Sequence, residues 1–142
     1  ESLAIKRETG DRGGEAGSLN NLGNIAKTRG DLVEAERLYQ ESLAIGEEIG
    51  YREGEAASLH GLGMIAETRG DLVEAERLQR ESLAIQREIG DRDGEARSLM
   101  NLGVIAASRG DPDEQRRLNT EVVKIHREMG IPIAQWLIDN GY

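Results

Sequence analysis

A fixed repeat constrains this chain more than any other feature of its sequence. Residues 21–35 recur almost unchanged forty residues later, and recur again with more differences after another forty. Residues 11–50 and 51–90 are identical at 29 of 40 positions, and residues 91–130 match 51–90 at 21 of 40. A period in this range is typical of repeat proteins, in which each unit packs mainly against its neighbours. We therefore predict a single array of three repeats.

Each repeat carries the pattern of two helices joined by a tight turn. Leucine, isoleucine and alanine recur three and four residues apart, which is the spacing of an amphipathic helix. In the first repeat, Gly30 supplies a left-handed helix end, and Asp31 follows as the N-cap of the next helix. The pattern predicts helix A at about 12–29 and helix B at about 32–49, with Gly50 ending the second. The expected fold class is all-α, a right-handed superhelical solenoid of antiparallel helix hairpins.

The two ends of the chain depart from this unit. Residues 1–10 match the end of helix B in the later repeats, so we expect them to be the end of a truncated helix B and the chain to be part of a longer array. Residues 131–142 are expected to form a C-terminal capping helix that begins near Pro132. In that helix Ile133, Trp136 and Leu137 form one stripe, which we expect to cover Val122, Ile125 and Met129.

Composition excludes several classes of partner and site. The net charge is −9, which disfavours nucleic acid because phosphate binding requires clustered lysine and arginine. No apolar run is long enough to span a membrane. Cysteine is absent, so no thiolate metal site can form. Residues 11–50 carry 8 acidic and 4 basic side chains, whereas 91–130 carry 8 and 7. That gradient suits a basic partner, although solubility is the simpler explanation.

The repeat resembles the tetratricopeptide repeat. The helix A pattern of that family, a large residue followed by Leu-Gly and a small residue, is met by Leu19, Leu22, Gly23 and Ala26, and by their counterparts in the other two repeats. The helix B pattern is met by Ala35, Tyr39 and Ser42, is weaker in the second copy with Gln79, and fails in the third with Gln115 and Asn119. The 40-residue unit is similar to those of Pins-type scaffolds and kinesin light chains. The resemblance implies a concave groove lined by the A helices that holds a peptide segment of another protein.

Differences between the repeats point to the candidate site. Five of the helix A positions that differ between the first two copies have a spacing that places them on one face, opposite the leucines. By the resemblance this face lines the groove, although an exposed face can also drift without selection. The candidate peptide-binding residues are Asn20, Asn21, Asn24, Lys27, His60, Met64, Glu67, Arg97, Met100, Asn101 and Val104.

The groove chemistry expected from these residues is mixed. Asparagine both donates and accepts, which suits a peptide backbone, while Met64, Met100 and Val104 offer apolar contact. Lys27, Glu67 and Arg97 nearly cancel in charge. The family's clamp for a C-terminal carboxylate requires several basic groove residues that this sequence lacks, so we do not expect such a ligand.

Several motifs that can indicate a function lie in a sequence context that argues against that function. Arg-Gly-Asp occurs at 29–31, 69–71 and 109–111, but each copy joins a helix end to an N-cap. The string at 61–66 resembles a dinucleotide-binding motif, but it lies inside a helix with no strand before it. The only histidines, His60 and His126, lie on different elements two repeats apart. We therefore expect no catalytic residue, cofactor or metal.

The sequence favours a cytoplasmic protein-interaction scaffold whose partner is a protein or peptide. The first alternative is a structural module that self-associates end to end through the open N-terminal repeat, with Leu3 and Ile5 exposed there. The second is a regulatory array of a larger multidomain protein.

Overall fold

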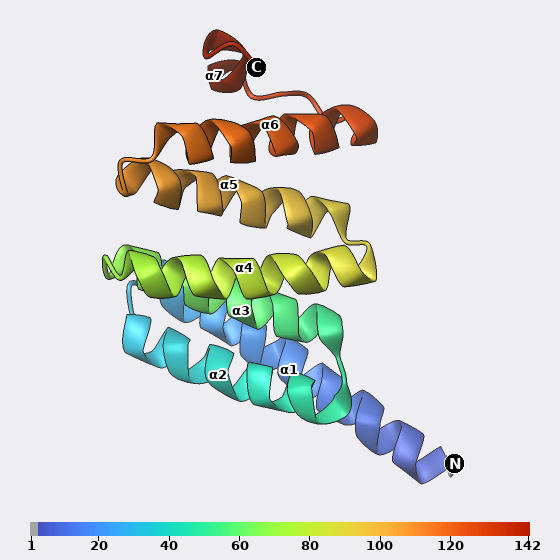
Figure 1. Ribbon diagram of the computed structural model, residues 1–142. Helices are drawn as coiled ribbons and strands as arrows, with labels where there is room; N and C mark the ends of the chain where they lie inside the picture. The colour runs from blue at the N-terminus through green and yellow to red at the C-terminus, as the bar shows by residue number, and fades with distance from the viewer. Residues whose placement is uncertain (1–2) are drawn as a thin grey trace.

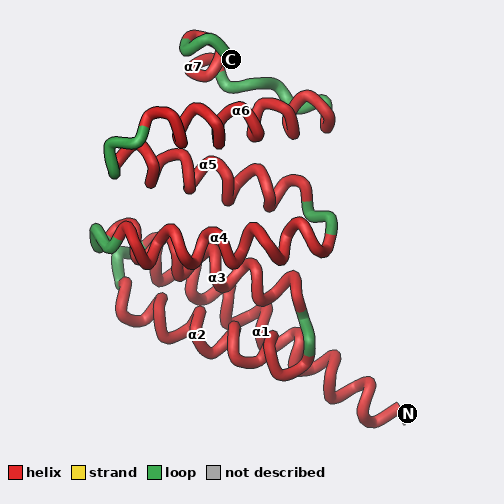
Figure 2. Tube along the Cα trace, viewed as in Figure 1, coloured by secondary structure: helices red, strands yellow, loops and turns green. Residues whose placement is uncertain are grey.

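The chain forms an array of stacked helical hairpins. A computed structural model describes residues 3–142, and the side chains of residues 10–142. The helices of this described part, with no strand among them, are α1 (Leu3–Thr28), α2 (Leu32–Ile49), α3 (Arg52–Thr68), α4 (Leu72–Ile89), α5 (Arg92–Ser108), α6 (Pro112–Met129) and α7 (Gln135–Asp139). Each of the pairs α1–α2, α3–α4 and α5–α6 packs as an antiparallel hairpin, and the hairpins stack in chain order (Figures 1 and 2). The predicted all-α solenoid is confirmed.

The turns between the helices form as the sequence predicts. The glycine that ends each helix A has a positive φ, 81° at Gly30, a conformation that favours glycine. The aspartate that follows is the N-cap of helix B, and the side chain of Asp31 accepts the N–H of Glu34 at 3.2 Å. The same capping bond recurs in α4 and α6. These local signals fix where each hairpin turns, and therefore which face each helix A presents.

Close packing between neighbouring helices centres on Tyr39. This side chain is fully buried, and it lies against Gly23 of its own hairpin and Gly61 of the next. A Cβ added at Gly61 would lie 2.5 Å from the Tyr39 ring, so only glycine allows this approach. Within each of the first two hairpins a buried serine also ties helix B to helix A, and Ser82 Oγ donates to the backbone oxygen of Ala56 at 2.9 Å.

The N-terminal segment differs from the sequence prediction. Residues 3–10 do not form a separate helix end, because α1 continues through Gly10 as one helix of 26 residues. Gly50, Gly90 and Gly130, the counterparts of Gly10, have φ values of 71°, 73° and 70°. Those glycines turn the chain where the end of a helix B packs against its own helix A. Gly10 instead lies inside α1. The expected exposure of Leu3 and Ile5 lies outside the described side chains.

The C-terminal segment forms a shorter cap than the sequence predicts. Helix α7 is present and buries Leu137, which is 1% exposed, but Trp136 remains 47% exposed and Met129 42%. The expectations that Trp136 packs inward with the stripe of the cap and that the cap covers Met129 are therefore wrong. A five-residue helix covers only part of α6, and the segment is also held by the Arg127 guanidinium, which donates to the backbone oxygen of Tyr142 at 3.0 Å.

The remaining residues of the expected capped stripe are buried in another way. Val122 and Ile125 are 0% and 4% exposed, and both belong to the core cluster that joins α4, α5 and α6. Ile133 is half-buried. The interior of the last hairpin therefore closes mainly through its own two helices. No helix in the described part of the chain is both long and apolar enough to cross a membrane.

Candidate functional site

Residues from all three repeats meet in one hollow on the side of the A helices. This A-helix hollow has a volume of about 130 Å³ and is lined by α1, α3 and the beginning of α5, with one side chain from α4. Five of the predicted site residues line it, namely Asn20, Asn24, Lys27, His60 and Arg97. These residues are separated by up to 77 positions in sequence, and only the stacking of successive A helices brings them together.

Lys27 enters the hollow without a carboxylate partner. Its Nζ lies 3.3 Å from Sδ of Met64, and no carboxylate of the described residues lies within ion-pair distance of it. Burial lowers the pKa of the Lys27 ammonium, because a charged group loses hydration there. A half-buried cation in this state gains from an anionic or strongly polar group supplied from outside.

His60 is held in place by a glutamine from the neighbouring helix B. The amide nitrogen of Gln79 donates to the His60 backbone oxygen at 3.3 Å, and Oε1 of Gln79 lies 3.0 Å from Nδ1 of His60. The Nδ1 atom therefore carries the proton, which leaves Nε2 as an acceptor. Burial lowers the pKa of His60, and the nearby charges of Arg97 and Lys27 lower it further. The imidazole is thus neutral at pH 7.

The asparagines offer complementary groups. The Tyr39 hydroxyl donates to Oδ1 of Asn24, so the Asn24 side chain presents its amide hydrogens as donors. Oδ1 of Asn20 is buried and has no hydrogen-bond partner among the described residues. An unpaired buried acceptor costs free energy unless a donor reaches it. One asparagine is therefore prepared to donate and the other to accept.

The other predicted site residues lie outside the hollow. Asn21 and Val104 are exposed, and Met100 packs against the core cluster of α4, α5 and α6. Asn101 occupies in α5 the place that Gly61 occupies in α3, where the residue faces the preceding helix B. Met100 thus serves packing rather than the groove, because the helix A face that varies in sequence is wider than the hollow.

The charged residues that line the hollow differ from the expected set, in which the charges of Lys27, Glu67 and Arg97 nearly cancel. Glu67 does not line the hollow, although burial raises the pKa of its carboxyl. Glu53 and Asp91 line it instead. Asp91 is already occupied as the N-cap of α5, where it accepts the N–H of Gly94 at 2.9 Å. The hollow is therefore lined by two cations, Lys27 and Arg97, and by two acids.

Sequence comparison missed the polar residues that helix B contributes. Gln86 lines the hollow, is 3% exposed and accepts from Ser98 Oγ at 2.8 Å through its side-chain oxygen. Gln79, which positions His60, is fully buried. Gln79 and Gln86 stand where the first repeat has Tyr39 and Gly46. A glutamine on the buried face of a helix was the signal in the sequence that could have identified them. Among the described residues, no three His, Asp or Glu side chains gather in a way that could hold a metal ion.

A family comparison decides the classification of the chain. The model described as tetratricopeptide repeat matches residues 14–88 and again residues 54–128. The chain belongs to the tetratricopeptide repeat family. Repeats of this family generally mediate interactions between proteins. The A-helix hollow therefore lies on the face of a tetratricopeptide array that the sequence resemblance assigned to the groove.

A comparison with solved structures agrees on the fold. BtubC (BKLC) from P. vanneervenii superimposes with a TM-score of 0.76 and 22% sequence identity. The match covers 93% of this chain and 55% of that chain, so this tetratricopeptide array spans about half the length of that relative. At this identity the likeness is one of fold. A comparison with curated protein sequences finds no significant match.

Proposed function

We propose that this tetratricopeptide array is a non-catalytic interaction scaffold that holds a peptide segment of a partner protein in the A-helix hollow. The observation that carries the proposal is that two polar groups of α1 enter a hollow shared by all three repeats without partners of their own. Oδ1 of Asn20 is buried and unpaired within the described residues, and Lys27 is half-buried with no carboxylate beside it. A bound segment supplies what these groups lack.

The chemistry of the hollow suits an extended backbone. Asn20 accepts a backbone N–H of the ligand, and the Asn24 amide donates to a backbone oxygen, since its own oxygen is taken by Tyr39. Lys27 faces a polar or anionic group, and the adjacent Met64 provides an adaptable apolar contact. A peptide is therefore fixed by its backbone, and side chains near Lys27 and Met64 add selectivity.

The test starts from an unbiased peptide library selected against the folded chain. The affinity of a selected peptide is then measured for Asn20→Ala and for the matched control Asn21→Ala, which changes the neighbouring residue outside the hollow. Loss of one hydrogen bond of about 1 kcal/mol weakens binding about fivefold in Asn20→Ala. The control is expected to bind as the wild type does. Equal affinity in all three proteins, with retained helicity, contradicts the proposal.

A second candidate function, self-association, has one observation in its favour. The outer face of α1 exposes Leu22 by 50% and Ile25 by 48%. The counterparts of Ile25 in the next repeats, Ile65 and Ile105, are 2% and 1% exposed, because the preceding helix B covers them. The same face of α1 thus has the shape of a packing surface. Sedimentation over a range of concentrations tests this candidate, and a monomer at the highest concentration removes it.

Strict end-to-end stacking is disfavoured by the opposite end of the array. Between repeats, Arg69 and Arg109 pair with Glu36 and Glu76 of the preceding helix B. At the corresponding place of α6 the residue is Arg116, whose guanidinium lies 5.0 Å from the ring centroid of Tyr142. A second copy stacked head to tail would bring like charges together there. A regulatory role within a larger cytoplasmic protein is compatible with either candidate.

A further inference from the structure

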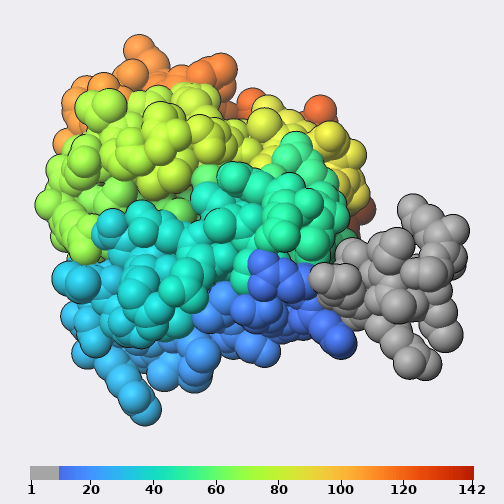
Figure 3. All heavy atoms as spheres, turned by 90° about the horizontal axis from the view of Figure 1, so that it is seen from below, coloured from blue at the N-terminus to red at the C-terminus, as the bar shows by residue number. Residues whose placement is uncertain are grey.

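A larger cavity than the A-helix hollow lies on another surface, between helices α2 and α4. This first lateral groove has a volume of about 530 Å³, and α3 forms its floor. The apolar side chains that line it are Leu43, Leu59, Leu62, Ile65 and Leu78. Seen from below, α2 (cyan) and α4 (yellow-green) lie on either side of a hollow on this face (Figure 3). The groove shares no lining residue with the A-helix hollow.

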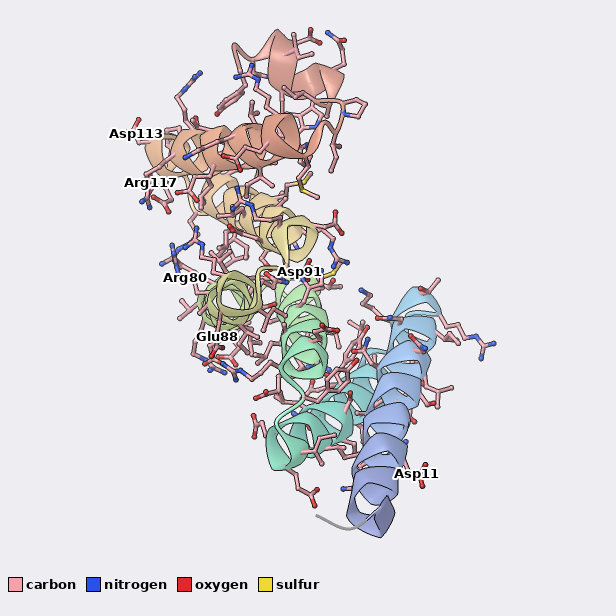
Figure 4. The ribbon with its side chains drawn as sticks, turned by 90° about the vertical axis from the view of Figure 1, so that its right-hand side faces the viewer. Asp11, Arg80, Glu88, Asp91, Asp113 and Arg117 are labelled. Atoms are coloured by element: carbon pink, nitrogen blue, oxygen red, sulfur yellow. The ribbon has the colours of Figure 1, made fainter. Side chains whose placement is uncertain are left out.

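The repeat provides a sister groove for comparison. The second lateral groove lies between α4 and α6, with a volume of about 360 Å³. Two ion pairs join α4 to α6 on this side. Arg80 pairs with Glu114 at 3.4 Å within the groove lining, and Arg87 pairs with Glu121 at 3.0 Å beyond it. Arg80 reaches from α4 toward the start of α6, near Arg117 (Figure 4). The far half of this groove is closed, and the counterpart of Leu43, Leu83, is 5% exposed there.

The first lateral groove lacks both of the cations that join α4 to α6 beside its sister. Gln40 stands in the place of Arg80, and Glu47 stands in the place of Arg87. Across the groove the acceptors are retained as Glu74 and Glu81. Glu47 therefore occupies, opposite Glu81, a position that holds an arginine in the sister groove. Like charges repel, and the result is an open groove with two carboxylates where the repeat elsewhere places an ion pair.

Most other charges around the first lateral groove are already paired. Arg69 pairs with Glu36, and Arg77 donates to Glu74 and to Oε1 of Glu81 at 2.6 Å. Oε2 of Glu81 has no ion-pair partner among the described residues, and neither has Glu47. Glu47 and one carboxylate oxygen of Glu81 thus lack a cationic partner, and both residues lie beside the leucine floor of the groove.

We propose that the first lateral groove is a second docking site, which binds a basic amphipathic segment of a partner protein. An arginine of that segment inserts between Glu47 and Glu81 in place of the missing counterpart of Arg87, and an aliphatic side chain beside it packs on Leu43. Arginine suits this position because its planar guanidinium donates to two carboxylates at once. This site is separate from the A-helix hollow, because it lies on another face. It also selects a cationic group, whereas Lys27 in the hollow favours a polar or anionic one.

The experiment uses the full chain labelled with ¹⁵N and a short capped peptide that contains two arginines and two leucines. A matched peptide carries citrulline, the neutral isostere, at both arginine positions. Amide shift changes are expected around Gln40, Glu47 and Glu81, and the citrulline peptide is expected to bind about fivefold more weakly.

Two variants exchange the charge patterns of the two lateral grooves. Glu47→Arg gives the first groove the ion pair of the second and is expected to abolish binding of the arginine peptide. Arg87→Glu removes that pair from the second groove and is expected to add a second set of shift changes along α4 and α6. Equal binding of the two peptides, or unchanged binding by Glu47→Arg with an unaltered fold, overturns the proposal. Shift changes confined to the A-helix hollow overturn it as well.

Discussion

Replacement of Gly61 by alanine tests how the array shapes its hollow. Gly61 lines the hollow and lies beneath Tyr39, and an added Cβ would be 2.5 Å from Cζ and 2.7 Å from Cε1 of that ring. Carbon atoms pack best at about 3.5–4.0 Å, and Tyr39 has no exposed surface, so the ring must move against its neighbours. The Tyr39 hydroxyl holds Asn24, and the displacement therefore reaches the binding residues.

The size of the effect follows from two opposing contributions. Alanine in place of glycine inside a helix stabilises by about 1 kcal/mol, whereas overpacking of a close contact costs about 1–3 kcal/mol. Gly17→Ala is the matched control, because Gly17 lies in α1 and a Cβ there meets nothing within 4 Å. We expect Gly17→Ala to be more stable than Gly61→Ala by about 1–3 kcal/mol, the cost of the contact alone. Urea unfolding followed by circular dichroism measures the difference, and equal midpoints with equal slopes refute the role assigned to Tyr39.

Three further predictions concern the pH response, the core and the ends of the array. The pKa of His60 is below its ordinary value of 6.5 in the folded chain, so the unfolded chain takes up the proton first as pH falls. The free energy of unfolding should therefore decrease below about pH 6.5. In urea titrations at pH 7 and pH 5, His60→Gln should flatten that decrease. Ser82→Ala removes the bond to Ala56 and should lower stability by about 1 kcal/mol, while an unchanged unfolding midpoint contradicts this. Leu22→Gln combined with Ile25→Gln should reduce any concentration-dependent association in sedimentation without lowering the melting temperature, and association that persists rules out the outer face of α1.

Most of the fold was predictable because its signals are local and repeated. Gly30 and Asp31 mark the turn between α1 and α2 by backbone conformation and capping, and each needs only its immediate neighbours to act. The continuation of α1 through Gly10 was not predictable from the repeat. There the counterpart of three helix-ending glycines lies inside a helix.

The candidate site was only partly predictable for a different reason. Asn20, Lys27 and His60 were identified because they vary on one helix face, and they do line the hollow. Variation does not say how far that face extends, so Met100 was included although it packs against the core cluster of α4, α5 and α6. The two glutamines of α4 were missed, because their importance depends on which helix A residue they contact, His60 in the same hairpin and Ser98 in the next. The first lateral groove likewise became visible only when Glu47 and Glu81 were placed opposite each other.

The central claim is that a partner segment binds across the A helices of all three repeats. The most direct measurement is amide chemical-shift mapping of the ¹⁵N-labelled chain with a peptide selected from an unbiased library. The account predicts shift changes on α1, α3 and α5 together, at Asn20, His60 and Arg97. Changes confined to the B helices, or to a single repeat, would contradict it.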